Sequence, residues 1–166
     1  MTWAKAKQDE QLKTVMVTCH GQPKTEGGSC NAYDGDTLCT ERRPILCFKP
    51  DGSPRPPYAV TPNREYYEGW APGRVGVTQP VAGNSLQNLA AANAACEQAL
   101  GKGYRMAEFH DGKLVAGMDA QNWYGATWPQ GGQASGGWAF HAHGTVPSDT
   151  RFWISINDQR AHCWDQ

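Results

Sequence analysis

The pattern of apolar and polar positions in the first half of the chain predicts two short strands. They are residues 14–18 and 45–48, where apolar and β-branched residues follow one another. Residues 5–13 are polar and predict a frayed segment. Residues 50–64 are rich in proline and turn residues, which predicts a rigid, extended connector.

The clearest helical pattern in the chain covers residues 85–100. Asn84 or Ser85 can cap its start, and Gly101 is a natural stop. Residues spaced three and four apart form one face of this helix: Leu86, Leu89, Asn93, Cys96 and Leu100. The spacing therefore predicts that the cysteine on this face points inward.

The second half of the chain contains further strand patterns. Four segments are predicted as strands: 74–78, 104–110, 138–143 and 152–156. Residues 161–164 are predicted to return as a last antiparallel strand beside 152–156. A long glycine-rich loop covers residues 111–137. The pattern as a whole predicts an α+β fold with short antiparallel strands, one main helix and a long irregular loop.

The proline-rich connector divides the predicted domain into two parts within one compact unit. Residues 1–64 form a cysteine-rich N-terminal extension with the connector, and residues 65–166 form the main domain. The total of 166 residues is enough for one domain with a sizeable core. We expect a monomer.

The charge balance excludes several classes of partner. The chain has 15 Lys and Arg against 16 Asp and Glu, and this net charge of −1 argues against nucleic acid, which requires a basic surface. It argues equally against electrostatic attachment to a membrane surface. No apolar run approaches the roughly 20 residues that cross a bilayer. Residues 1–12 lack the apolar centre of a signal peptide, so export would mean that the signal had been removed.

Six cysteines favour a disulfide framework, and therefore a secreted, periplasmic or cell-surface protein. The alternative is a cytosolic protein with reduced thiols. The chain has no Cys-x-x-Cys pair, which weakens a zinc interpretation. The simplest pairing joins Cys96 to Cys163, closing a loop worth about 4 kcal/mol on the chain-entropy model. The other four then pair among themselves: Cys19, Cys30, Cys39 and Cys47.

Several runs in the second half carry a resemblance to a known fold. They are Val75-Gly76-Val77-Thr78, Pro80, Gly83, Ala92-Asn93-Ala94-Ala95-Cys96 and Tyr104-Arg105-Met106-Ala107. With the order of the predicted elements, they resemble the C-type lectin-like fold, and most closely its endostatin branch, over residues 66–166. The resemblance implies that Cys96 and Cys163 form the long disulfide between the first helix and the C-terminal strand. Residues 104–112 and 151–159 also resemble a group of uncharacterised secreted bacterial proteins, which implies export and no particular activity.

The sequence departs from the sugar-binding members of that fold. Their Glu-Pro-Asn or Gln-Pro-Asp triplet is missing, and the nearest proline-containing segment is Val146-Pro147-Ser148-Asp149. Calcium-dependent sugar binding of their type is therefore not expected, nor is heparin binding through an arginine-rich surface.

Aromatic residues in and after the long loop are the candidate ligand-binding residues. They are Trp123, Tyr124, Trp128 and Trp138. Flat rings on a loop can stack on sugar rings or anchor a protein partner. The alternative is that they fill a small core belonging to the loop itself.

Two pairs of residues are candidate metal ligands. His141 and His143 lie two apart on a predicted strand, so both face one side, as zinc ligands would. Asp34 and Asp36 offer oxygen atoms in a turn, as calcium ligands would. The alternatives are polar residues on a strand edge and an ordinary Asp-Gly turn.

Glu108, His110 and Asp111 are candidate acid/base residues, which Asp149 and Asp158 would join in space. The alternative is polar residues at the end of a strand and its turn. We therefore expect a secreted domain that binds a glycan or a protein through the loop between residues 111 and 150. A metal-dependent or acid/base hydrolase is the second hypothesis, and a structural protein of the envelope or extracellular matrix is the third.

Overall fold

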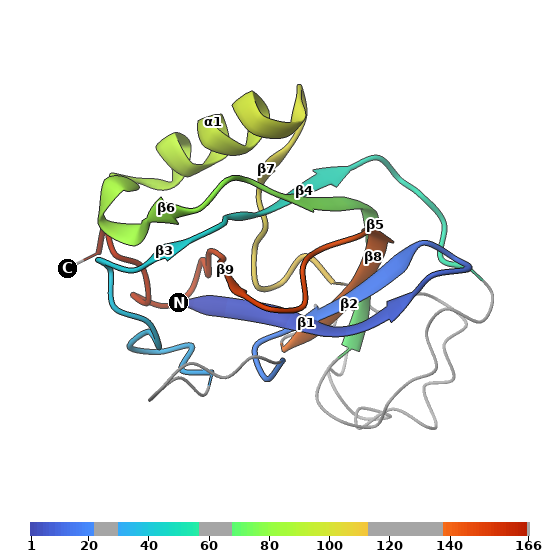
Figure 1. Ribbon diagram of the computed structural model, residues 1–166, viewed down its shortest axis with the longest axis horizontal. Helices are drawn as coiled ribbons and strands as arrows, with labels where there is room; N and C mark the ends of the chain where they lie inside the picture. Colours follow the sequence, from blue (N-terminus) through green and yellow to red (C-terminus); the bar gives the residue numbers. More distant parts are fainter. Residues whose placement is uncertain (22–29, 57–67, 113–137, 166) are drawn as a thin grey trace.

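Strands make up most of the regular structure in the computed structural model, which describes residues 1–21, 30–56, 68–112 and 138–165 (Figure 1). The helical elements are η1 (Gly83–Ser85) and α1 (Leu89–Leu100). The strands are β1 (Thr2–Asp9), β2 (Thr14–Thr18), β3 (Arg42–Arg43), β4 (Leu46–Pro50), β5 (Glu68–Val77), β6 (Val81–Ala82), β7 (Arg105–Met106), β8 (Ala139–Gly144) and β9 (Arg151–Trp153). The α+β class is confirmed. No helix in these ranges is long and apolar enough to cross a membrane.

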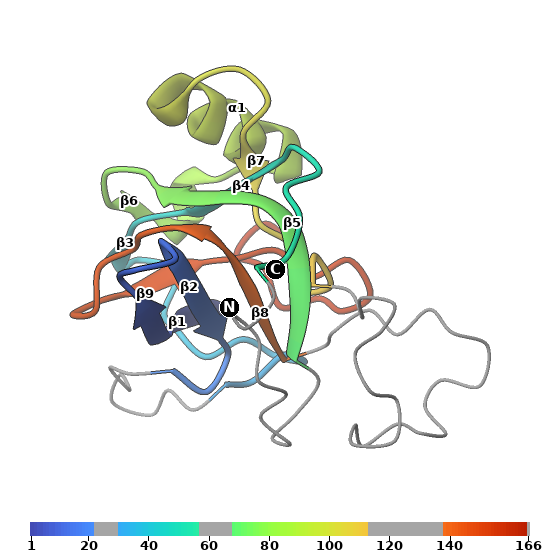
Figure 2. The ribbon, with the colours of Figure 1, turned by 90° about the vertical axis from the view of Figure 1, so that its right-hand side faces the viewer.

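Seven strands form one curled sheet in the order β7-β4-β5-β8-β2-β1-β9. Neighbouring strands run antiparallel except β5 and β8, which are parallel, so the expectation of antiparallel strands fails for this pair. The sheet curls far enough for β9 to reach the chain before β4 (Figure 2). There the Trp153 N–H donates to the Pro44 carbonyl at 2.8 Å, and Trp153 forms a parallel bridge with Ile45. The curl therefore encloses one face of the sheet.

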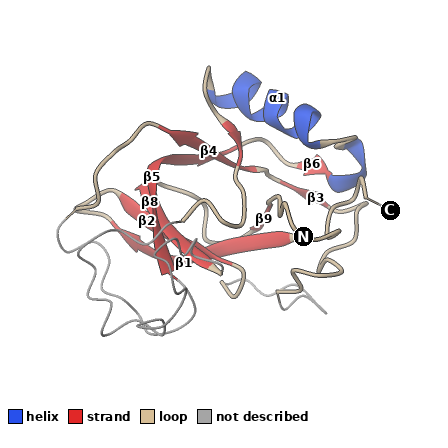
Figure 3. Cartoon of the chain, turned by 180° about the vertical axis from the view of Figure 1, so that it is seen from behind, coloured by secondary structure: helices blue, strands red, loops and turns tan. Residues whose placement is uncertain are grey.

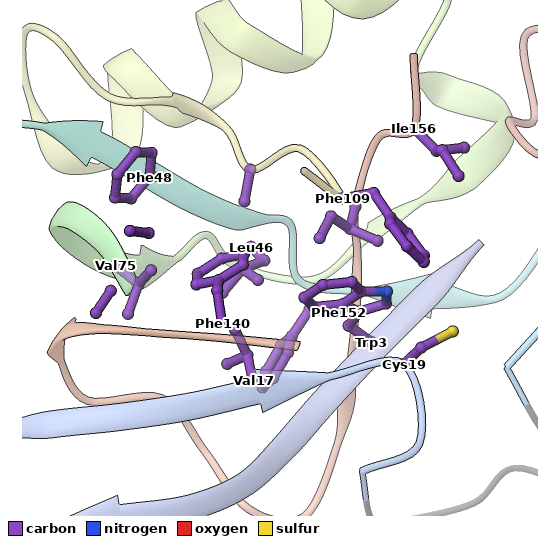
Figure 4. Close-up of a cluster of buried hydrophobic side chains, with 14 of the residues drawn as sticks. Trp3, Val17, Cys19, Leu46, Phe48, Val75, Phe109, Phe140, Phe152 and Ile156 are labelled. Carbon is purple, nitrogen blue, oxygen red and sulfur yellow. The ribbon is translucent and has the colours of Figure 1, made fainter. Parts of the chain in front are cut away.

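The main hydrophobic core lies on this enclosed face (Figure 4). Alternate residues of the strands point into it, as the two-residue period of a strand requires. Trp3 is fully buried there, with ring centroids 4.9 Å from Phe109 and 5.5 Å from Phe140. The other large members drawn in Figure 4 include Val17, Leu46, Phe48, Val75, Phe152 and Ile156. Burying each large apolar side chain stabilises the fold by about 1.5–3 kcal/mol.

Helix α1 covers the outer face of the sheet beside β4, β5 and β7 (Figures 1 and 3). The helix begins at Leu89, later than the predicted residue 85, because the Asn88 side chain accepts from the Ala91 N–H at 2.8 Å and caps it there. Cys96 faces inward, as predicted. A second apolar cluster fills the space beneath the helix: Ile45, Cys47, Leu86, Ala92, Cys96, Met106 and Trp153. Strand β4 is therefore buried on both faces.

The disulfides differ from the predicted pairing. They join Cys19 to Cys30, Cys39 to Cys163, and Cys47 to Cys96, so all six cysteines are bonded. The predicted Cys96–Cys163 bond is wrong. The predicted pairing of the four N-terminal cysteines among themselves holds for Cys19 and Cys30 and is wrong for Cys39 and Cys47. The reason is that Cys47 lies on the outer face of β4, directly beneath the helix residue Cys96, at a Cα separation of 5.6 Å.

The N-terminal residues belong to the sheet. Residues 5–13 are predicted to fray, but residues 5–9 belong to β1 and pair with β2, and residues 10–13 form the turn between the two strands. Before them, Thr2–Ala4 pair with β9, and Met1, Trp3 and Ala4 are buried. Strands β1, β2 and β4 lie within the same sheet as β5 and β8. The N-terminal part therefore contributes to the main core, where the sequence predicts an extension that ends at residue 64.

Residues 161–165, the closing segment, do not form the predicted strand or hairpin. Side-chain contacts hold this segment in place. His162 Nε2 accepts from the Ile156 N–H at 2.9 Å, and its Nδ1 lies 2.6 Å from an Asp165 oxygen. The ring stacks on Trp164 with centroids 4.4 Å apart. The Met1 amine donates to the Ala161 carbonyl at 2.7 Å.

These contacts predict a loss of stability in mild acid. Burial lowers the pKa of His162 below its usual 6.5, and a neutral Nε2 is needed to accept from the Ile156 N–H. The stabilisation of the folded state by neutral His162 is therefore fully present above pH 6.5, and it is lost as the pH falls through the lower pKa that His162 has in the folded state. Burial also lowers the pKa of the Met1 amine from 8.0 to about 6, with the same direction of effect between those values.

We therefore expect the free energy of unfolding, measured by denaturant titration, to fall as pH is lowered from 8.0 through 6.5. His162→Gln keeps an acceptor for Ile156 and removes the titration, so its profile below 6.5 is expected to be flatter. Identical profiles for the two proteins would contradict this role of His162.

Candidate functional site

One end of the curled sheet gathers the residues that the sequence singles out. The last residue of β2, Thr18, pairs with Ala139 at the start of β8, which pairs in turn with Glu68 at the start of β5. Figure 2 shows the starts of β5 and β8 together at the lower end of the sheet. Gly112 also passes here, because a Cβ on it would lie 2.5 Å from the Phe140 Cβ.

Several aromatic rings lie at this end in contact with one another. We call them, together with the carboxylates of Glu108 and Asp158, the Trp138 cluster; its rings are those of His20, Trp138, Phe109 and His110. The Trp138 ring stacks on His20 with centroids 5.7 Å apart and an interplanar angle of 22°. Its other neighbour is Phe109, at 5.3 Å and 77°, which in turn contacts His110 at 5.2 Å. Phe109 is buried and is therefore the fixed centre of these rings, whereas Trp138 is half-buried.

Backbone contacts fix the position of Trp138. Its carbonyl accepts from the Cys19 N–H at 3.1 Å and from the Thr18 hydroxyl at 2.7 Å. Cys19 is bonded to Cys30. The backbone at Trp138 is therefore held by strand β2 beside a disulfide, and the ring itself is flanked by His20 and Phe109.

Both carboxylate oxygens of Glu108 accept hydrogen bonds from the backbone. Its Oε2 accepts from the His110 N–H at 2.8 Å and its Oε1 from the Asn157 N–H at 3.3 Å. Burial raises the pKa of Glu108, while His110 and these N–H groups oppose the rise. Because both oxygens are used by the backbone, Glu108 positions residues 108–111 against the closing turn.

Asp111 is neutralised by an arginine. Its carboxylate accepts hydrogen bonds from both terminal nitrogens of Arg105, one of them at 3.1 Å, and from the Glu108 N–H at 2.7 Å. The guanidinium of Arg105 lies over the Phe48 ring at 5.3 Å. Asp111 therefore shapes the turn, and we assign it no acid/base role.

Asp158 is the open carboxylate of the cluster. One of its oxygens lies 3.5 Å from His110 Nε2, and the side chain is 56% exposed. The prediction that Asp158 joins Glu108, His110 and Asp111 in space is confirmed. Asp149 is exposed and has no hydrogen bond or ion pair to the cluster within the described ranges. The cluster thus contains a half-buried indole, an imidazole and an exposed carboxylate.

The histidines predicted to bind metal lie on β8, away from the enclosed core. His141 is buried and pairs in register with Trp70 and with Met16. His143 contacts the Trp70 ring edge-on at 5.1 Å. Among the residues that the structure describes, no group of three or more His, Cys, Asp or Glu could hold a metal ion. The expectation of a zinc site therefore has no support there.

The predicted calcium ligands are used by the fold. Asp36 accepts from both the N–H and the hydroxyl of Thr2, at 2.8 and 3.0 Å, and faces Arg151. Asp34 belongs to a turn in which the Asn31 side chain accepts from the Asp34 N–H at 3.0 Å. The interpretation as an ordinary turn is the one that the structure favours.

The remaining predicted residues, Trp123, Tyr124 and Trp128, lie outside the described residues. His20 was missed because nothing in its local sequence marks it. Its only signal was its position next to Cys19, and the partner of that cysteine was not known from the sequence.

Comparisons with known proteins give no relative for this chain: no family model matches it, and neither does a curated protein or a solved structure.

Proposed function

We propose that this protein is an exported domain that binds a glycan through the Trp138 cluster. The observation that carries the proposal is the Trp138 ring, which is held half-buried between His20 and Phe109 in the same cluster as the exposed carboxylate of Asp158. A pyranose ring presents a flat C–H face that can pack on an indole, and hydroxyl groups that can donate to a carboxylate. A site with one apolar face and a few polar groups at its edge suits such a ligand.

Export is supported by the three disulfides. Such bonds persist in oxidising compartments and are rare in the cytosol. We therefore infer a secreted, periplasmic or cell-surface location, which separation of a producing cell into its compartments would test.

The relationship to C-type lectin-like domains is also a proposal. It is supported by α1, the one α-helix among the described residues, which a disulfide joins to the sheet, and by the 25 residues of sequence (113–137) that precede β8. The bond from Cys96 to Cys47, where the resemblance implies a bond to Cys163, departs from that pattern.

Replacing the Trp138 ring tests the proposed function. Trp138→Ala removes the stacking face, and we expect it to weaken the binding of responsive oligosaccharides by about thirtyfold, the effect of losing a central aromatic contact of about 2 kcal/mol. Trp138→Phe keeps a ring and should lose less. Tryptophan fluorescence and calorimetric titration with a panel of oligosaccharides measure the effect.

Trp164→Ala is the matched control for this experiment. Trp164 also stacks on a histidine, His162, but lies in the closing segment outside the Trp138 cluster. We expect this variant to bind as the wild type does. Equal losses in both variants, or no response of the wild type to any glycan, would overturn the proposal; binding of a protein and of no glycan would replace it with protein recognition.

A hydrolase is the second candidate, favoured by the burial that raises the pKa of Glu108 beside His110. It would release products from a bound oligosaccharide, and Glu108→Gln would abolish that release. Because both Glu108 oxygens accept backbone N–H groups, the geometry favours binding.

A further inference from the structure

The charges of the Trp138 cluster and its surroundings are not balanced. Three carboxylates lie here, and Arg105 neutralises only Asp111. Within the described ranges, neither Glu108 nor Asp158 forms an ion pair with a lysine or arginine. Arg160 is exposed, two residues after Asp158, and forms no ion pair with it. Among the described residues, the cluster and its surroundings therefore hold three carboxylates against the single guanidinium of Arg105.

Of the two carboxylates in the cluster, Asp158 is the one available to a ligand. Both Glu108 oxygens accept backbone N–H groups, whereas the polar contact of Asp158 within the described part of the chain is to His110 Nε2 at 3.5 Å, and its side chain is 56% exposed. A positive group placed beside Asp158 would also interact favourably with Glu108, whose pKa is already raised by burial and by Asp111. The same group would lie near aromatic rings, which attract cations.

We propose that the ligand is a glycan whose sugars carry free, protonated amino groups. This inference rests on the proposed function, since it assigns the class of sugar that binds the Trp138 cluster. The sugar ring packs on Trp138, and its ammonium group donates a charge-assisted hydrogen bond to Asp158. N-acetylation would keep the ring and remove the charge, and a uronic acid would be repelled.

The test compares sugars that differ only in this group. Calorimetric titration uses a glucosamine tetrasaccharide, its fully N-acetylated form and a glucuronic acid oligosaccharide, slightly below neutral pH so that the sugar amine is protonated. We expect the amino form to bind about tenfold more tightly than the N-acetylated form, as a charge-assisted bond replaces a neutral one, and the uronic acid to bind more weakly than both. Added salt should reduce the preference.

Asp158→Asn identifies the residue responsible. The variant should bind both tetrasaccharides within about threefold of one another, because the larger loss falls on the amino form. Asp149→Asn is the control, because Asp149 is an exposed aspartate outside the cluster, and it should keep the full preference.

The outcomes separate the two proposals. Equal binding of the amino and N-acetylated sugars by the wild type would overturn the amino-sugar inference and leave the proposed function standing. A preference that survives in Asp158→Asn would overturn the role of Asp158. Failure of every oligosaccharide to bind would overturn both the inference and the proposed function.

Discussion

Arg151→Met is expected to destabilise the protein by about 3–5 kcal/mol, because it leaves a buried charge and three carbonyls without their partner. The side chain is 1% exposed and lies among several segments. Its nitrogens donate to the Thr2 carbonyl at 2.7 Å, the Cys19 carbonyl at 2.8 Å and the Gly21 carbonyl at 2.9 Å. Its guanidinium also lies 3.6 Å from the buried carboxylate of Asp36. Denaturant unfolding of the variant measures the loss.

An exposed ion pair provides the matched control for this substitution. Arg74 pairs with Asp51 at 3.0 Å, but its side chain is 61% exposed, so Arg74→Met should cost no more than about 1 kcal/mol. Asp36→Asn should lower the free energy of unfolding less in the Arg151→Met background than in the wild type, because the arginine that pairs with Asp36 is already absent there. Similar losses in Arg151→Met and Arg74→Met would contradict the structural role of Arg151.

Removal of the Cys47–Cys96 bond is expected to cost about 4 kcal/mol on the chain-entropy model and to release α1. Both cysteines are fully buried, and Ala92 and Cys96 are the only buried residues of the helix. The disulfide is therefore its principal anchor. The double variant Cys47→Ala, Cys96→Ala tests this by denaturant unfolding and by hydrogen exchange of the helix amides.

The Cys19–Cys30 bond is the comparison for this variant. It closes only 11 residues of chain separation and does not touch the helix, so its removal should cost about 3 kcal/mol and leave exchange in α1 unchanged. Peptide mapping of the wild type should recover Cys47 with Cys96. Recovery of Cys96 with Cys163, or unchanged helix exchange in the Cys47 and Cys96 variant, would contradict the account.

Local patterns predict elements that owe their conformation to nearby residues. The run 14–18 forms β2, and the run 45–48 overlaps the start of β4; their apolar residues are buried except Met16, which is half-buried. The α1 helix is found because its spacing and its stop at Gly101 are local features. Its start is displaced because several polar residues compete as caps and Asn88 is the one that bonds. These successes rest on periodicity alone.

Elements that depend on distant pairing could not be predicted in this way. Strand β1 is mostly polar after Ala4, and this part is ordered by pairing with β2, whereas β9 pairs with Thr2–Ala4. The predicted last strand, 161–164, has no strand beside it, and His162 holds it instead. Disulfide partners follow from the curl of the sheet, which brings Cys47 beneath α1, and sequence separation contains no information about that curl.

For the candidate site, the sequence predicts which residues lie together but not what each of them does. Glu108, His110 and Asp111 are neighbours in the sequence, and their proximity to Asp158 is confirmed. Their roles depend on tertiary partners, such as Arg105 for Asp111, that no local pattern shows. His20 joins Trp138 only because β2 pairs with β8.

The most direct test of the central claim is to locate a bound glycan on the folded protein. ¹H–¹⁵N spectra recorded with and without the glucosamine and N-acetylglucosamine tetrasaccharides report on each amide and on each indole N–H. If the glycan binds the Trp138 cluster, we expect shifts at the Trp138 indole and at the amides of His20, His110 and Asp158, with α1 and Trp164 unchanged. Shifts centred on α1 or Trp164, or no shifts with either sugar, would contradict binding at the Trp138 cluster.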